Sequence, residues 1–266
     1  MSLASRPLAG FVLALVLVTG IAAPAASQAQ PDATEPLVQA ADESEIYAPF
    51  ATAAEFVEQQ YLDILRRTPS QAEIDYQVGL LEDGRVPTDL IDEFVESAEA
   101  NSNIKAVVRL YRAYYLRNPD FRGLSHWIQR RQQGITLNAI STEFARSPEF
   151  AVRYGVLSDE AFVDFVYERV MKREPDTAGR AYWLGRLTTD IHRGQFMTFF
   201  SESAEYVKLT SYQSSAVTLF TGMFQASMKE GPFSSLVSSL SSGRTTIAET
   251  AADYLDDRDY LRRFED

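Results

Sequence analysis

Hydrophobic residues between positions 158 and 211 recur at the spacing of an α-helix. Six apolar positions at i, i+1, i+4, i+5, i+8 and i+9 form one broad apolar face on a helix of about three turns. These positions are Phe162, Val163, Val166, Tyr167, Val170 and Met171. Pro175 ends this helix, because the residue before a proline is pushed out of the helical conformation. Since no stretch of the chain alternates in the way that a strand requires, the sequence predicts an all-α fold.

Further helices are expected after this proline. Asp176 is placed to cap a second helix, whose first turn includes Gly179, because its carboxylate can accept a free backbone N–H and meets the helix dipole favourably. We expect a third helix near residues 195–201 and a last short turn that begins at Ser203, with Glu205 near the positive end of its dipole. Tyr182, Trp183 and Leu187 are expected to lie at packing distance from one another on the second helix. The third helix is expected to direct Phe196, Phe199 and Phe200 inward.

The same pattern occurs three times along the chain. A proline and five further residue types at fixed offsets from it recur in three windows, which indicates an internal repeat. The matching residues are Tyr61, Tyr111 and Tyr167; Arg67, Arg117 and Arg173; Pro69, Pro119 and Pro175; Phe94, Phe144 and Phe200; Ser97, Ser147 and Ser203; and Glu99, Glu149 and Glu205. The second and third windows also share Asp120 with Asp176, Gly123 with Gly179, and Trp127 with Trp183. The first window has Ser70, Glu73 and Gln77 at these three places, so it is a divergent copy.

The windows divide the chain into tandem small helical bundles. We expect repeats at 54–104, 105–157 and 158–211, each with three or four helices, and a degenerate fourth repeat at 212–266. The fourth repeat lacks the Trp, Pro and Arg markers, and terminal repeats are commonly atypical because they cap a stack. Residues 30–53 are rich in Ala, Pro, Asp and Glu, and we expect them to form a flexible linker.

The first 29 residues have the features of a signal peptide. A basic start precedes an apolar run from Phe11 to Ala23, and small residues follow. Because a membrane span needs about 20 apolar residues, we expect cleavage and a secreted or cell-envelope location, with membrane contact only if the leader is retained uncleaved as an anchor. The chain has no cysteine, and its formal net charge of −12 disfavours nucleic acid and anionic lipid as partners.

The segment FVDFVYERVMKREPDTAGRAYWLGRL, followed by FFSESAEY, resembles the bacterial family named domain of unknown function 4214. The resemblance rests on an aromatic helix, a turn of the form G-R-x-P-D-x-x-G, a Tyr-Trp pair and a closing F-x-x-S-x-E-aromatic. Lys172 departs from it, standing where the family usually has Gly. The resemblance implies a small all-helical fold similar to phycobilisome linker domains. It also implies tandem occurrence in exported or surface proteins, often beside calcium-binding repeats or adhesion modules, and it assigns no catalytic residue.

Residues suited to catalysis are scarce. The only histidines are His126, which stands where the other copies have an aromatic residue, and His192, which lies in a polar loop. No nucleophile elbow, zinc motif or phosphate-cradling glycine loop occurs. The acidic cluster 253–259 lacks the glycine and the alternating carboxylates of an EF-hand. We therefore expect no catalytic, cofactor or metal residue, and we interpret the repeated residues as structural, with Trp127 and Trp183 packed in the core.

A partner surface is expected at aromatic residues that exceed what one narrow core stripe requires: Tyr114, Tyr115 and Phe121. A wide buried face between the second and third repeats is the alternative. The function we expect is that of an exported, non-catalytic scaffold or protein-interaction module at the cell envelope or outside the cell. Its partner would be an unknown protein or an envelope polysaccharide. The alternatives are a calcium-dependent or carbohydrate-binding adhesion module and an enzyme of unrecognised type.

Overall fold

The computed structural model describes residues 46–265. The predicted leader, and the predicted linker up to residue 45, lie outside the described residues. Packing begins earlier than the expected start at Ala54, because the side chain of Tyr47 is buried and its ring centroid lies 5.7 Å from that of Phe56. The ring of Phe50 contacts Phe264 at the other end of the described chain, at a centroid distance of 4.9 Å. The last residues of the expected linker therefore belong to the folded unit. The prediction that the linker is flexible as far as residue 53 is wrong.

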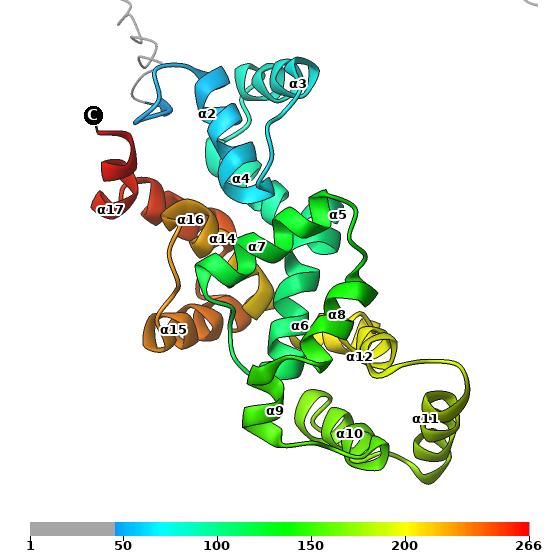
Figure 1. Ribbon diagram of the computed structural model, residues 1–266. Coiled ribbons are helices and arrows are strands. Elements are labelled where there is room, and N and C mark those ends of the chain that lie inside the picture. Colours follow the sequence, from blue (N-terminus) through cyan, green and yellow to red (C-terminus); the bar gives the residue numbers. More distant parts are fainter. Residues whose placement is uncertain (1–45, 266) are drawn as a thin grey trace, which may run out of the picture. The chain divides into compact units, whose positions relative to one another are not determined.

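Four groups of helices follow one another along the chain, and no strand occurs between residues 46 and 265 (Figure 1). The first group is α2 (Ala53–Gln60), which continues as the π-helical turn η1 (Tyr61–Leu65), then α3 (Gln71–Glu82), α4 (Pro87–Glu96) and α5 (Ala98–Ala100). The second is α6 (Ala106–Tyr115), α7 (Phe121–Gln132), α8 (Leu137–Ala145) and α9 (Pro148–Tyr154). The third is α10 (Asp159–Phe165) with η3 (Val166–Val170), α11 (Thr177–Thr189), α12 (Arg193–Ser201) and α13 (Ala204–Leu209). The fourth is α14 (Ser211–Phe224), α15 (Glu230–Ser241), α16 (Ile247–Leu255) and α17 (Arg258–Leu261), followed by η4 (Arg262–Phe264).

The all-α tandem repeat is thereby confirmed, and each of the four repeats has a first, second, third and closing helix. The π-helical segment η2 (Asn101–Lys105) joins α5 to α6, so the predicted boundary between repeats 1 and 2 falls inside a continuous helical stretch.

Short-range signals set the ends of the helices. Asp176 caps α11 as expected, since its Oδ1 accepts the backbone N–H of Gly179 at 2.8 Å. Ser203 caps the closing helix α13 in the same way, accepting the N–H of Tyr206 at 3.2 Å. Each first helix ends at a residue in the left-handed conformation, and none of these residues is glycine: Arg66, Leu116, Lys172 and Gln225. This position corresponds to the glycine that the turn G-R-x-P-D places before its arginine.

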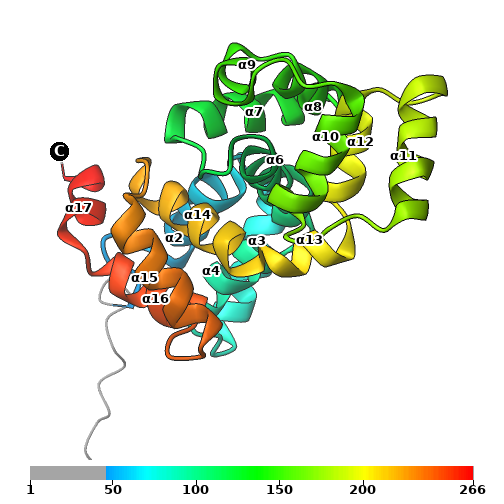
Figure 2. The same cartoon turned by 90° about the horizontal axis from the view of Figure 1, so that it is seen from below.

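The third helices of the repeats pack in pairs. Helix α8 contacts α12, which joins repeats 2 and 3, and α4 contacts α16, which joins repeats 1 and 4 (Figures 1 and 2). The first helices follow the same pairing, because α14 packs on η1 and α6 packs on η3. Repeat 4 therefore lies against repeat 1 rather than capping the end of a linear stack, which corrects the expectation from the sequence.

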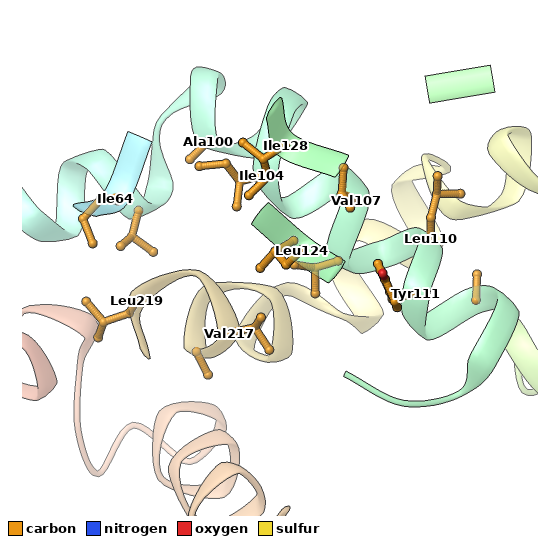
Figure 3. Close-up of a cluster of buried hydrophobic side chains, with 14 of the residues drawn as sticks. Ile64, Ala100, Ile104, Val107, Leu110, Tyr111, Leu124, Ile128, Val217 and Leu219 are labelled. Carbon is orange, nitrogen blue, oxygen red and sulfur yellow. The ribbon is translucent and has the colours of Figure 1, made fainter. Parts of the chain in front are cut away.

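Helix α6 lies at the centre of the core. Nine of its ten residues are buried, so it is enclosed on all sides rather than along one stripe. Figure 3 shows part of this core, in which side chains from η2, α6, α7 and α14 converge: Ile104, Val107, Leu110, Leu124, Ile128, Val217 and Leu219. The aromatic richness of α6 follows from this position.

Buried charged side chains connect repeats that are distant in sequence. Asp63 is fully buried in repeat 1, and its Oδ1 pairs with Nη2 of Arg263 in repeat 4 at 2.7 Å. Lys105 donates from Nζ to Glu96 at 2.8 Å and to Ser215 of α14 at 2.9 Å. These polar contacts add specificity to the pairing of repeats 1 and 4, because a charge that loses its partner in the interior is strongly destabilising.

Candidate functional site

The residues that recur in repeats 1, 2 and 3 contact one another. In repeat 3 the ring centroids of Tyr167 and Phe200 lie 5.1 Å apart, and the guanidinium carbon of Arg173 lies 4.9 Å from the Tyr167 centroid. Nε of Arg173 then donates to Oε1 of Glu205 at 3.1 Å. The same three contacts occur in repeat 1 through Tyr61, Phe94, Arg67 and Glu99, and in repeat 2 through Tyr111, Phe144, Arg117 and Glu149. In repeats 1 to 3, the ion pair between this arginine and this glutamate thus joins the end of the first helix to the closing helix.

Asp176 and Tyr167 leave no room for a side chain at Gly179. A Cβ atom at this position would lie 2.8 Å from Oδ2 of Asp176 and 3.1 Å from the Tyr167 hydroxyl. Gly123 has the equivalent neighbours, Tyr111 and Asp120. Burial, followed by the charge of Asp120, raises the pKa of the Tyr111 phenol, so that this hydroxyl remains protonated at neutral pH.

The remaining hallmark residues are also structural. Trp127 and Trp183 are half-buried and pack against the core, with ring centroids 5.2 Å from Phe144 and 5.3 Å from Phe200 respectively. Pro119 and Pro175 lie between the first and second helices of their repeats. Ser147 caps α9 through the N–H of Phe150, as Ser97 caps α5 through the N–H of Ala100.

Repeat 1 compensates for its divergence. Ser70 and Glu73 form a capping box at the start of α3 in place of the aspartate cap. Arg67 is held between two carboxylates, at 2.6 Å from Glu73 and 2.6 Å from Glu99. These hydrogen bonds, first from Arg67 and then from Ser70, lower the pKa of Glu73 to about 2.

The predicted partner surface is wrong for two of its three residues, because these two side chains are buried. Tyr114 and Tyr115 are 0% and 4% exposed, because α6 is enclosed by the other helices. Their hydroxyls are bonded to Ser141 at 2.8 Å and to Ser147 at 3.0 Å. These two tyrosines instead belong to a wide buried face between repeats 2 and 3, which was the alternative to a partner surface. Phe199, expected to point inward, is 52% exposed beside Trp183.

Phe121, the third predicted surface residue, lines a cavity on the surface of the described residues. The cavity has a volume of about 570 Å³ and lies between the end of η1 in repeat 1 and α7 in repeat 2. We call it the α7 groove, and its lining residues are Leu62, Arg66, Phe121, Arg122, Ser125, His126, Ile128, Gln129 and Gln132. Repeat 4 contacts the start of α7, since the backbone N–H of Phe121 donates to Oγ of Ser227 at 2.9 Å.

The α7 groove is basic. Arg66, Arg122 and His126 line it, and none of its lining residues in the described chain is Asp or Glu. Burial lowers the pKa of Arg66 to about 10, which still leaves it charged at neutral pH. Its guanidinium carbon lies 5.3 Å from the centroid of the Phe121 ring, and its Nη2 donates to the carbonyl of Thr221 at 2.5 Å. Cationic and apolar groups are thereby held together on one surface.

The sequence pointed to only part of this groove. Phe121 was predicted as a surface residue, and His126 was noted only as a substitute for an aromatic residue. Leu62 and Arg66 were missed because they come from another repeat. Leu62 is 40% exposed in the structure, which its apolar character does not indicate in the sequence.

The histidines and paired glutamates that could carry acid–base or metal chemistry were located in the structure. No group of three or more His, Asp or Glu side chains in residues 46–265 is arranged to hold a metal ion. His192 caps α12, with Nδ1 accepting the N–H of Gln195 at 3.3 Å. Glu202 and Glu205, which resemble an acid–base pair by spacing, bind different arginines, Arg109 and Arg173.

Comparison with known families assigns the class of protein. Residues 36–104 and 141–210, just over half of the chain, match the domain of unknown function DUF4214. The chain belongs to this family, as the resemblance indicated, and the matches include repeat 1, the divergent copy. Neither the curated proteins nor the solved structures contain a significant match. None of the helices between residues 46 and 265 combines the length and apolar character that crossing a bilayer requires.

Proposed function

We propose that this chain is an exported, non-catalytic interaction module that acts at the cell envelope or outside the cell, and that the α7 groove binds an acidic segment of a protein partner. The observation that carries the proposal is the charge of the groove. A chain of net charge −12 has Arg66, Arg122 and His126 on one surface without a lining carboxylate. Such a surface attracts a negatively charged partner, and the exposed parts of Leu62 and Phe121 offer it apolar contact.

The unpaired state of Arg122 supports this assignment. Arg122 is exposed on α7 and forms no ion pair with any residue between 46 and 265. By contrast, the arginines of the repeat hallmark are each bound to a glutamate. Arg122 is therefore available to a partner without breaking a contact that maintains the fold.

Fractionation and co-sedimentation test the proposal. The full chain, expressed in a bacterial host, is expected in the periplasmic, envelope or extracellular fraction; recovery in the cytoplasm alone would contradict export. The purified chain is then mixed with cell envelopes, and Arg122→Glu is expected to reduce the bound fraction. Arg258→Glu is the matched control, because Arg258 is exposed on α17 and lies outside the groove. Equal binding by both variants would refute the groove as the contact surface.

A carbohydrate-binding function is the second candidate, and an exposed aromatic cluster on repeat 3 favours it. Tyr182 is 54% exposed and Phe199 is 52% exposed, and both rings contact Trp183. Exposed aromatic faces of this kind can stack on sugar rings. Protease treatment of the envelopes separates the two candidates: a protein partner is lost, whereas binding that survives treatment and falls in Phe199→Ala indicates polysaccharide. Repeating the assay in chelator tests calcium-dependent adhesion.

A further inference from the structure

A second cavity lies where repeats 2, 3 and 4 meet, and it does not belong to the α7 groove. Its volume is about 200 Å³. It is lined by Arg112 from α6, by Arg169 and Lys172 at the end of the first helix of repeat 3, and by Tyr206 and Gln213. We call it the junction cavity. Since a water molecule occupies about 30 Å³ in the liquid, the space suits a ligand of roughly six or seven waters in size.

Three cations line the junction cavity without a carboxylate among them. None of Arg112, Arg169 and Lys172 forms an ion pair with a described residue. Arg112 is held in place by a hydrogen bond from Nη1 to Oδ1 of Asn118 at 2.6 Å and by the ring of Phe233, whose centroid lies 5.6 Å from its guanidinium carbon. Its remaining N–H donors are free for a ligand.

Nearby negative groups do not cancel this charge. The first helices of repeats 2 and 3 end beside the cavity, and each C-terminus carries about half a negative charge. Glu230 is the carboxylate whose charge acts on Arg112. With these contributions included, the three cations still leave a net local charge of about +1. Tyr206 stays neutral and able to donate a hydrogen bond, because burial raises its pKa to about 12.

Lys172 occupies this place at a conformational cost. Its φ is 58°, in the left-handed region that favours glycine. In repeat 3 its side chain supplies a third cation to the cavity.

We infer that the junction cavity is a binding site for the phosphate group of a small ligand, held by Arg112, Arg169 and Lys172. The net positive charge favours an anion, and the acceptor oxygens of a phosphate group can bind to donors on several side chains at once; arginine and lysine are common ligands of phosphate. The site has no part in the proposed docking of a partner at the α7 groove, so either can fail without the other.

Calorimetric titration of the full chain with inorganic phosphate, glycerol 1-phosphate and acetate tests the inference. Both phosphates are expected to bind with a stoichiometry of one, and acetate, a monoanion, is expected to bind far more weakly. Binding of inorganic phosphate alone would identify the free anion as the ligand, whereas tighter binding of glycerol 1-phosphate would identify an ester. Absence of heat with either phosphate at millimolar concentration, or equal binding of acetate, would overturn the inference.

Lys172→Gly gives a test that does not endanger the fold, because glycine suits the left-handed backbone. We expect about a tenfold loss of phosphate affinity, the effect of losing one charged hydrogen bond, together with a raised melting temperature. Gln225→Gly is the matched control, since it relieves the same backbone conformation in repeat 4 outside the cavity. It is expected to raise the melting temperature without changing affinity. Unchanged affinity in Lys172→Gly would contradict the assignment.

Discussion

The hydroxyl group of Tyr167 lies over Gly179, 3.1 Å from the point that a Cβ atom would occupy. The tyrosine comes from the first helix of repeat 3 and the glycine from the first turn of the second. This contact explains why the two residue types recur together in repeats 2 and 3. In repeat 1, where Glu73 replaces the glycine, the side chain instead turns to Arg67 and Ser70.

We predict opposite effects for two alanine substitutions in α11. Gly179→Ala is expected to lower the free energy of unfolding by about 1–2 kcal/mol, because the new methyl group displaces Asp176 from its cap or Tyr167 from its packing. Gly185→Ala is expected to raise it by about 0.5–1 kcal/mol, because Gly185 has open space around it and alanine favours the helix. Urea denaturation measures both, and effects of the same sign would contradict the proposed role of Gly179.

The C-terminal end of α14, the first helix of repeat 4, offers a second prediction. Gln225 is exposed with a φ of 49°, so Gln225→Gly is expected to stabilise the protein by about 0.5–1 kcal/mol. Gln225→Ala shares the loss of the long side chain but keeps the conformational cost, and it should leave the melting temperature nearly unchanged. If both variants melt at the same temperature, backbone strain is absent at this position.

The ion pair between Arg109 and Glu202 predicts an asymmetric response. The Arg109 side chain is 2% exposed, whereas that of Glu202 is 29% exposed. Glu202→Ala leaves a buried guanidinium without its carboxylate, and we expect a loss of about 3 kcal/mol. Arg109→Met leaves a carboxylate that water can reach and fills the space with apolar atoms, so a loss of less than about 2 kcal/mol is expected. Urea denaturation of both variants measures the two losses, and a larger loss in Arg109→Met than in Glu202→Ala would contradict this prediction.

Glu73 predicts a pH dependence. Its pKa of about 2 in the folded protein is below the value of about 4.3 in an unfolded chain. The stabilisation that it contributes is therefore complete above about pH 4.3 and is lost as the pH falls toward 2. Glu73→Gln should destabilise the protein at pH 7 and show a smaller further loss than the wild type between pH 4.5 and 2.5. Parallel stability curves over this range would exclude the contribution of Glu73.

The local parts of this fold could be predicted from the sequence because their causes are local. The caps at Asp176 and Ser203 depend on residues three positions away, and the buried face of Phe162 to Met171 follows from helical periodicity. Phe199 was assigned to the wrong face because its neighbours Phe196 and Phe200 are also aromatic, so periodicity alone did not separate the inner from the outer side.

The long-range parts could not be predicted in this way. Tyr114 and Tyr115 are buried because α6 is surrounded by elements from other repeats, a relationship that no local pattern contains. The α7 groove likewise needs Arg66 and Arg122 from different repeats. The pairing of Asp63 with Arg263 joins residues 200 positions apart, and neither residue belongs to the recurring set.

The contact between repeats 1 and 4 restricts how such a gene can evolve. In an open solenoid each unit touches only its neighbours, so duplication or loss of one unit has local consequences. Here an inserted or deleted inner repeat would move α16 away from α4 and leave the carboxylate of Asp63 buried without Arg263. We also expect this contact to form late in synthesis, because Asp63 gains its partner only after Arg263 has been synthesised. We therefore expect this arrangement to tolerate a change in the number of repeats less well than a linear array does.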